Sequence, residues 1–194
     1  MSELLLPSRL CPPPAYYRAM ALHPGPVRIC SGVRFDKRCK DAHRFTIADT
    51  RGPLTLTVPL DKPYGRTWAS TRISLHGNWW EVMAAALESA YGRTPFFEFY
   101  ADDFLPLIAS PDGFTTVGDL NERFDRAVRR ALGLQTEVIY DSEPLTAPLS
   151  AVEPWQPQPY WQVRAATLGF IPGLSILDLL FNLGPESLLL LSKS

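Results

Sequence analysis

The chain of 194 residues lacks a long hydrophobic run, and its longest run of leucines covers only residues 188–191. A membrane-spanning helix needs about 20 mostly apolar residues in succession, so we expect no membrane span. The opening residues MSELLLPSRL also lack the basic start and the extended apolar stretch of a secretion signal. Together these absences predict a cytoplasmic protein.

Cysteine is scarce, and neither charge sign is in excess. Cys11, Cys30 and Cys39 are the three cysteines of the chain, and no Cys-x-x-Cys pair occurs among them. This count gives no indication of a disulfide framework. A formal net charge of −1 provides no overall basic field for nucleic acid, so we expect no nucleic-acid partner.

Several motifs that carry chemistry are also missing. His23, His43 and His76 lie far apart and show neither HxH nor HExxH spacing, so we expect no metal site. The chain has no GxSxG elbow for a serine hydrolase. It has no Cys–His motif around Cys39, although basic neighbours favour a thiolate there. These absences give no indication of a cofactor.

Proline, in contrast, is abundant, with 19 in the chain, about twice the usual share of ~5%. Hydrophobic residues make up 46% and charged residues 20%, as in a globular protein with a sizeable core. We expect residues 1–194 to form a single domain. Five prolines fall within residues 144–159, and Trp155, Tyr160 and Trp161 can hold that segment on the core as an ordered covering loop.

The pattern of apolar residues predicts an α+β fold. HRFTIAD and PLTLTVPL flank the turn TRG, which is typical of a hairpin. Helix caps are indicated at Asn78 with Glu81, at Thr94 with Pro95, and at Thr116 with Asp119. We expect an N-terminal antiparallel or mixed sheet with helices from the second half packed on it. The further predicted strands are 3–6, 27–31, 68–75 and 134–141, and the further predicted helices are 12–22, 160–170 and 175–183.

Residues 34–44, RFDKRCKDAHR, are the first candidate site. Arginine forks and lysines suit phosphate or carboxylate groups, which makes this segment a candidate anion site. The alternative is a solvated loop and a strand edge protected by charge, because no glycine-rich phosphate loop accompanies the segment. The candidate anion-binding residues in it are Lys37, Arg38, His43 and Arg44.

A second candidate lies in AYGRTPFFEFY, where Tyr91 and Arg93 could complete a binding site and Glu98 could act as an acid or base. The alternative places Glu98 in the first turn of a helix, where the helix dipole favours a negative charge. We expect the neighbouring phenylalanines to lie in the core.

The stretch SILDLLFNLGPES holds Ser175, Asp178 and Asn182 among apolar residues. Ser175 and Asp178 have nearly the spacing of a capping box, which favours a structural role. Asn182 lies in a helix that must be largely buried, so it needs hydrogen-bond partners from elsewhere. It could hold the proline-rich loop or face a substrate, and Asp178 remains a second candidate acid or base.

Several stretches together resemble the WbqC-like protein family, in the form common in Bacteroidetes-type bacteria. They are VRFDKRCKDAHRFTIAD, LTLTVPL, WWEVMAAALESAYGRTPFFEFY and YWQVRAATLGFIPGLSILDLLFNLGPES. The resemblance implies a link to bacterial surface-polysaccharide (O-antigen) biosynthesis and suggests acyl or aminoacyl transfer. Lys37, Tyr91, Gln162, Asp178 and Asn182 match the family pattern, as do Phe96 and Phe97.

The chain departs from that pattern at three positions. Met83 stands where relatives often have a histidine, and Ala42 and His43 stand where many have an Asn-Arg pair. One hypothesis is therefore a transferase that holds a phosphate-bearing or sugar-linked small molecule through Lys37, Arg38 and Arg44. The other is a non-catalytic binding or scaffold protein with a protein partner.

Overall fold

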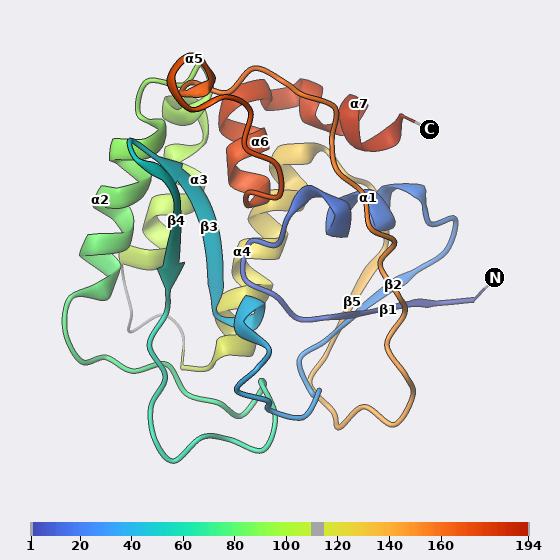
Figure 1. The fold of residues 1–194 in the computed structure, drawn as a ribbon. Coiled ribbons are helices and arrows are strands. Elements are labelled where there is room, and N and C mark those ends of the chain that lie inside the picture. Colours follow the sequence, from blue (N-terminus) through green and yellow to red (C-terminus); the bar gives the residue numbers. More distant parts are fainter. Residues whose placement is uncertain (1, 110–114, 194) are drawn as a thin grey trace.

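The computed structural model describes residues 2–109 and 115–193, and its strands form two separate sheets (Figure 1). The first has the order β1-β2-β5, with β1 (Leu4–Pro7), β2 (Val27–Cys30) and β5 (Val138–Asp141) all parallel. The second is an antiparallel hairpin of β3 (Arg44–Asp49) and β4 (Gly52–Thr57). The fold is α+β, as the sequence predicted.

Helices surround both sheets, and α4 lies between them (Figure 1). Helices α2 and α3 lie beyond the hairpin, whereas α6 and α7 lie beside α1. One hydrophobic core joins all of these elements, from Leu6 in β1 to Leu191 in α7. The helices are α1 (Pro14–Leu22), α2 (Trp79–Tyr91), α3 (Phe97–Ala109), α4 (Val117–Leu132), α5 (Ala165–Leu168), α6 (Ile176–Leu183) and α7 (Ser187–Ser192). The described part of the chain also contains the 3-10 turns η1 (Lys40–Ala42) and η3 (Gly184–Glu186).

Both ends of helix α4 are determined by residues in or next to the helix itself. Thr116 accepts a hydrogen bond from the Asp119 backbone N–H and the Asp119 side chain accepts one from the Thr116 backbone, so the predicted capping box is present. Gly133 ends the helix with φ of +69°, a left-handed conformation that glycine adopts without strain. Apolar residues along α4 are buried, for example Leu120 and Phe124.

The predicted strand at residues 68–75 is wrong. Residues 59–78 form a connecting loop instead, held by isolated bridges such as Leu60 to Ile73 and Arg34 to Thr67. The Thr71 hydroxyl donates a 2.7 Å hydrogen bond to the Thr67 carbonyl. Hydroxyl side chains that bond to nearby backbone favour turns over strands, which explains the difference.

The predicted start of α3 also differs from the structure. The helix begins at Phe97, and the Thr94 hydroxyl donates to the Tyr91 carbonyl rather than capping α3. Pro106 lies inside the helix, which continues to Ala109. The carbonyl that loses its partner at this proline belongs to Asp102, an exposed residue, so water can reach it.

The proline-rich segment 142–164, which we call the covering segment, runs past β1 and α1 toward α5 (Figure 1). Leu5 in β1 donates its backbone N–H to the Ser150 hydroxyl at 2.9 Å, and the Ser150 N–H donates to the Leu5 carbonyl at 2.8 Å. The Arg18 guanidinium lies over the Trp155 ring at 4.9 Å. These contacts order the segment against β1 and α1, as predicted, although Trp161, which was also expected to hold it, is exposed. Within the described part of the chain, no helix has the length and apolar character needed to cross a membrane.

Candidate functional site

A cavity of about 240 Å³ opens beside the start of β3. We call it the basic cleft, because Lys37, Lys40, His43 and Arg44 line it. Three of these, Lys37, His43 and Arg44, are among the candidate anion-binding residues of the sequence. The segment 34–44 therefore folds so that cationic side chains separated in sequence border one hollow.

The turn η1 fixes the position of this segment. The Asn121 amide of α4 donates to the Ala42 carbonyl at 3.0 Å, and the Leu10 N–H donates to the Asp41 carbonyl at 3.1 Å. Because η1 leads directly into β3, the hairpin holds the next residues. Lys40, His43 and Arg44 are thereby attached to rigid elements rather than to a free loop.

His43 is held in one orientation. Its Nδ1 lies 2.8 Å from the Val58 carbonyl oxygen, and because a carbonyl can only accept, Nδ1 carries the proton. Its ring also stacks on Trp68, with centroids 5.9 Å apart. Burial lowers the pKa of His43, and the charges of Arg44 and Lys40 lower it further, whereas the bond to Val58 opposes them. The neutral imidazole therefore keeps a lone pair on Nε2.

Aromatic rings form the other wall of the basic cleft. Phe35 stacks on Tyr64 with ring centroids 4.8 Å apart and meets Trp68 at 4.7 Å. The Lys37 ammonium lies 5.3 Å from the centre of the Tyr64 ring. The sequence reasoning missed these aromatic residues, although RFDK and PYGRTW both place an aromatic residue between or beside basic residues.

Arg44 has one donor that no described residue of the protein accepts. Its Nε is buried and has no hydrogen-bond partner among the described residues, although the residue lines the basic cleft. Unpartnered buried donors are costly, so an acceptor from a ligand or water would stabilise this side chain.

The remaining candidates from the sequence lie away from the basic cleft. Arg38 is 90% exposed in its side chain and pairs with Asp36 at 2.8 Å. Tyr91 is buried on the far end of β3, where its hydroxyl accepts from the Ala48 N–H at 3.2 Å. Arg93 and Glu98 are exposed, and Glu98 lies in the first turn of α3, as the dipole argument expected.

Asp178 lies in a buried hydrogen-bond network and does not line the basic cleft. Tyr160 donates its hydroxyl to Asp178 Oδ2 at 2.5 Å, and Gln162 Nε2 donates to the same oxygen at 2.8 Å. Tyr91 also interacts with this carboxylate. Burial raises the pKa of Asp178, while the hydrogen bonds that it accepts oppose that rise. We call Tyr91, Tyr160, Gln162 and Asp178 the Asp178 network.

Ser175 and Asn182 mark the two ends of α6. The Ser175 hydroxyl caps the helix by accepting from the Leu177 N–H at 3.2 Å. Asn182 donates to the Asp178 carbonyl at 2.7 Å, and its Oδ1 accepts from the Val163 N–H at 3.1 Å. Asn182 therefore joins α6 to the end of the covering segment.

The model of the WbqC-like protein family matches residues 10–150. That range contains the basic segment, the hairpin and helices α2 to α4, and so every residue of the basic cleft. Neither a curated protein nor a solved structure matches the chain at a significant level. Because the match covers well over half of the sequence, the chain belongs to the WbqC-like protein family.

Proposed function

We propose that the chain is a transferase-like protein of bacterial surface-polysaccharide (O-antigen) biosynthesis, of the Bacteroidetes type. In this proposal a phosphate-bearing or sugar-linked small molecule binds in the basic cleft. The observation that carries the proposal is the lining of that cleft, where Lys37, Lys40 and Arg44 surround a cavity beside a neutral His43.

The lining suits a phosphate attached to a ring. Lysine and arginine donate charge-assisted hydrogen bonds to phosphate oxygens, and these bonds are about twice as strong as neutral ones. The Tyr64 and Trp68 rings line the same cavity. Aromatic rings of this kind can pack against the apolar faces of a sugar or stack on a base. The charge and shape of the basic cleft thus favour one ligand that carries both a phosphate and a ring.

His43 is our candidate for moving a proton in a transfer reaction. In acyl transfer, an amine or hydroxyl attacks the carbonyl carbon of the donor and gives up its proton, and the leaving group departs with its bonding electrons. The Nε2 lone pair of a neutral histidine can accept that proton. Glu98 is exposed on α3 and Asp178 is enclosed by its network, so neither borders the basic cleft.

A thermal-shift screen with sugar phosphates, nucleotide sugars, and acyl or aminoacyl donors tests the proposal. A ligand at 100 times its dissociation constant stabilises a protein by about 2.7 kcal/mol, which moves the melting temperature measurably. We expect the Arg44→Gln variant to lose the shift and the exposed Arg51→Gln variant to retain it. If no phosphate-bearing compound shifts the wild type at saturating concentration, the proposal is wrong.

A non-catalytic binding protein is the second candidate, and the exposed Trp161 favours it. The side chain lies at the end of the covering segment and is 54% exposed. Met83, which replaces a histidine of the family pattern, is only 2% exposed in the core of α2 and does not line the basic cleft. Partner capture that is lost in Trp161→Ala and retained in Arg44→Gln would support this candidate.

A further inference from the structure

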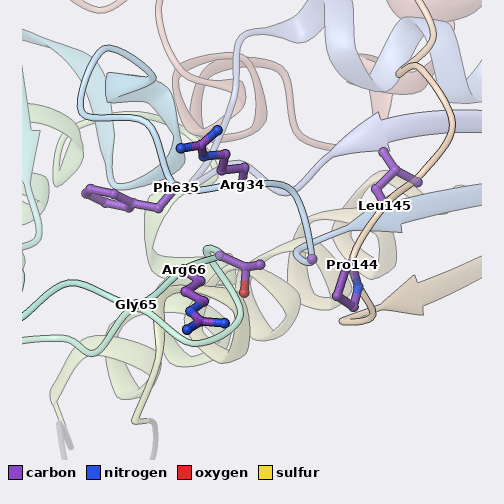
Figure 2. A pocket seen from close by; sticks show the side chains of 8 residues that line it. Arg34, Phe35, Gly65, Arg66, Pro144 and Leu145 are labelled. Carbon is purple, nitrogen blue, oxygen red and sulfur yellow. The ribbon is translucent and has the colours of Figure 1, made fainter.

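A second hollow adjoins the basic cleft, and Phe35 lines both. We call it the arginine groove, because Arg34 and Arg66 border it (Figure 2). Its volume is about 610 Å³, and Pro144 and Leu145 of the covering segment close one side.

One pair of backbone segments builds both hollows. The Phe35 N–H donates to the Arg66 carbonyl at 2.9 Å, and the Trp68 N–H donates to the Val33 carbonyl at 3.2 Å. Arg34 pairs with Thr67 in the same short bridge. This pairing fixes Phe35 and Trp68 in the basic cleft. It also fixes the two arginines at the groove, Arg34 one residue before Phe35 and Arg66 two residues before Trp68.

Charge is strongly one-sided across the two hollows. Five of the described residues that line them are cationic, and none of the described lining residues is an aspartate or glutamate. Arg34 and Arg66 are exposed, and neither forms an ion pair within the described part of the chain. Figure 2 shows their guanidinium groups pointing in opposite directions from the facing segments. Because neither group is paired with a carboxylate among the described residues, each remains available to an anion.

The sizes of the hollows indicate how much of a ligand each can hold. Small-molecule sites usually have volumes of about 300–1,000 Å³. The basic cleft, at about 240 Å³, is smaller than that range, whereas the arginine groove, at about 610 Å³, lies within it. A sugar phosphate would fill the basic cleft without entering the arginine groove. A larger ligand would have to extend past Phe35 into that groove.

We infer that the ligand is a nucleoside diphosphate sugar that occupies both hollows, an inference that rests on the proposed function of the basic cleft. One ring lies against Tyr64 and Trp68, and the other lies in the arginine groove. The diphosphate passes Phe35, which lies between the cationic residues of the basic cleft and those of the arginine groove.

Isothermal titration calorimetry with two ligand lengths tests this inference. The short probe is glucose 1-phosphate, and the long probes are the uridine, guanosine and thymidine diphosphate sugars. We expect the variant Arg34→Gln with Arg66→Gln to bind its long ligand about tenfold more weakly, because charge-assisted hydrogen bonds are lost. Binding of glucose 1-phosphate should stay unchanged. Arg44→Gln should weaken both.

The matched control removes the same charge elsewhere. Arg51→Gln with Arg123→Gln changes two exposed arginines outside both hollows. It should bind every probe as the wild type does, which separates direct contact from the loss of net charge. If the variant Arg34→Gln with Arg66→Gln binds the long ligand normally, or loses affinity for short and long ligands equally, the inference that one ligand occupies both hollows is wrong and the proposed function stands. If the wild type binds neither class, both are wrong.

Discussion

The Tyr160 hydroxyl donates a 2.5 Å hydrogen bond to Asp178 Oδ2, and this bond joins the covering segment to α6. Tyr160 comes from the end of a proline-rich stretch, and Asp178 is only 1% exposed. Hydrogen bonds to a charged group contribute about 1.5–3 kcal/mol. The covering segment is therefore fixed by a buried contact and not only by its surface packing.

Removing this hydroxyl should loosen the covering segment. We expect Tyr160→Phe to lower the free energy of unfolding by about 1.5–3 kcal/mol, since a charged acceptor loses one of its donors. Urea unfolding followed by far-UV circular dichroism measures the change. Tyr64→Phe is the matched control, because no hydrogen bond of that hydroxyl occurs within the described residues. Equal stability of the Tyr160 and Tyr64 variants would contradict this assignment.

The raised pKa of Asp178 predicts how its charge affects stability with pH. Because the folded pKa is above the unfolded value, the folded protein binds more protons in the window between the two. The contribution of Asp178 to stability therefore falls as pH rises through that window and is lowest above it.

Asp178→Asn removes this titration. The stability of the variant relative to the wild type should be highest near neutral pH and should decrease as the pH approaches 4. Urea unfolding of both proteins at several pH values measures the trend. The exposed Asp102→Asn variant is the control for a change of charge at the surface. A relative stability of Asp178→Asn that rises toward low pH would show that the sign is wrong.

His43 should titrate below its usual range and remain an Nδ1-protonated tautomer when neutral. Nitrogen-15 NMR of the imidazole distinguishes the two tautomers and follows the titration. Because the folded pKa is lowered, protonation of His43 costs stability as the pH falls below the unfolded value of about 6.5. The exposed His76 provides an internal comparison within the same spectra.

Ligand binding gives a second test of His43. A phosphate close to the imidazole favours the charged form, so a bound phosphate-bearing compound should raise the pKa of His43. The resonance of His76 should not move. If the ligand stabilises the protein but leaves the His43 titration unchanged, the ligand binds outside the basic cleft.

Local sequence patterns predicted the elements whose boundaries are set by nearby residues. Thr116, Asp119 and Gly133 define α4 within one continuous stretch, and the turn TRG defines the hairpin. The parallel pairing of Val27 with Val138 could not be read in this way, because it joins strands from opposite ends of the chain. A parallel pair needs a crossover and leaves no turn motif between its strands.

The basic cleft was predictable only on its cationic side. Lys37, His43 and Arg44 lie in one segment, and their composition indicates an anion site. Tyr64 and Trp68 come from a loop whose path depends on pairing with residues 33–35, so their proximity is a tertiary property. The loop was predicted in part as a strand, although the hydroxyl hydrogen bonds of Ser70 and Thr71 to the Thr67 carbonyl lie within one stretch of the chain.

The buried pair of Asp125 and Arg129 gives the sharpest stability prediction. Arg129 Nε donates to Asp125 Oδ2 at 2.8 Å, and Tyr140 donates to the same oxygen at 2.6 Å. Asp125 has a side-chain exposure of only 6%. Removing one partner of a buried pair leaves an unpaired charge, which usually costs about 3–5 kcal/mol. We therefore expect Arg129→Met to destabilise the protein strongly.

Arg126→Met is the matched control on the same helix. Arg126 pairs with Glu122 at 2.7 Å with the same spacing of four residues, but its side chain is 55% exposed. Exposed pairs of this kind contribute at most about 1 kcal/mol. Urea unfolding of both variants measures the difference, and adding Asp125→Asn to Arg129→Met should recover part of the loss, because the unpaired charge is gone. Equal effects of Arg126→Met and Arg129→Met would mean that burial of Asp125 does not determine the strength of the pair.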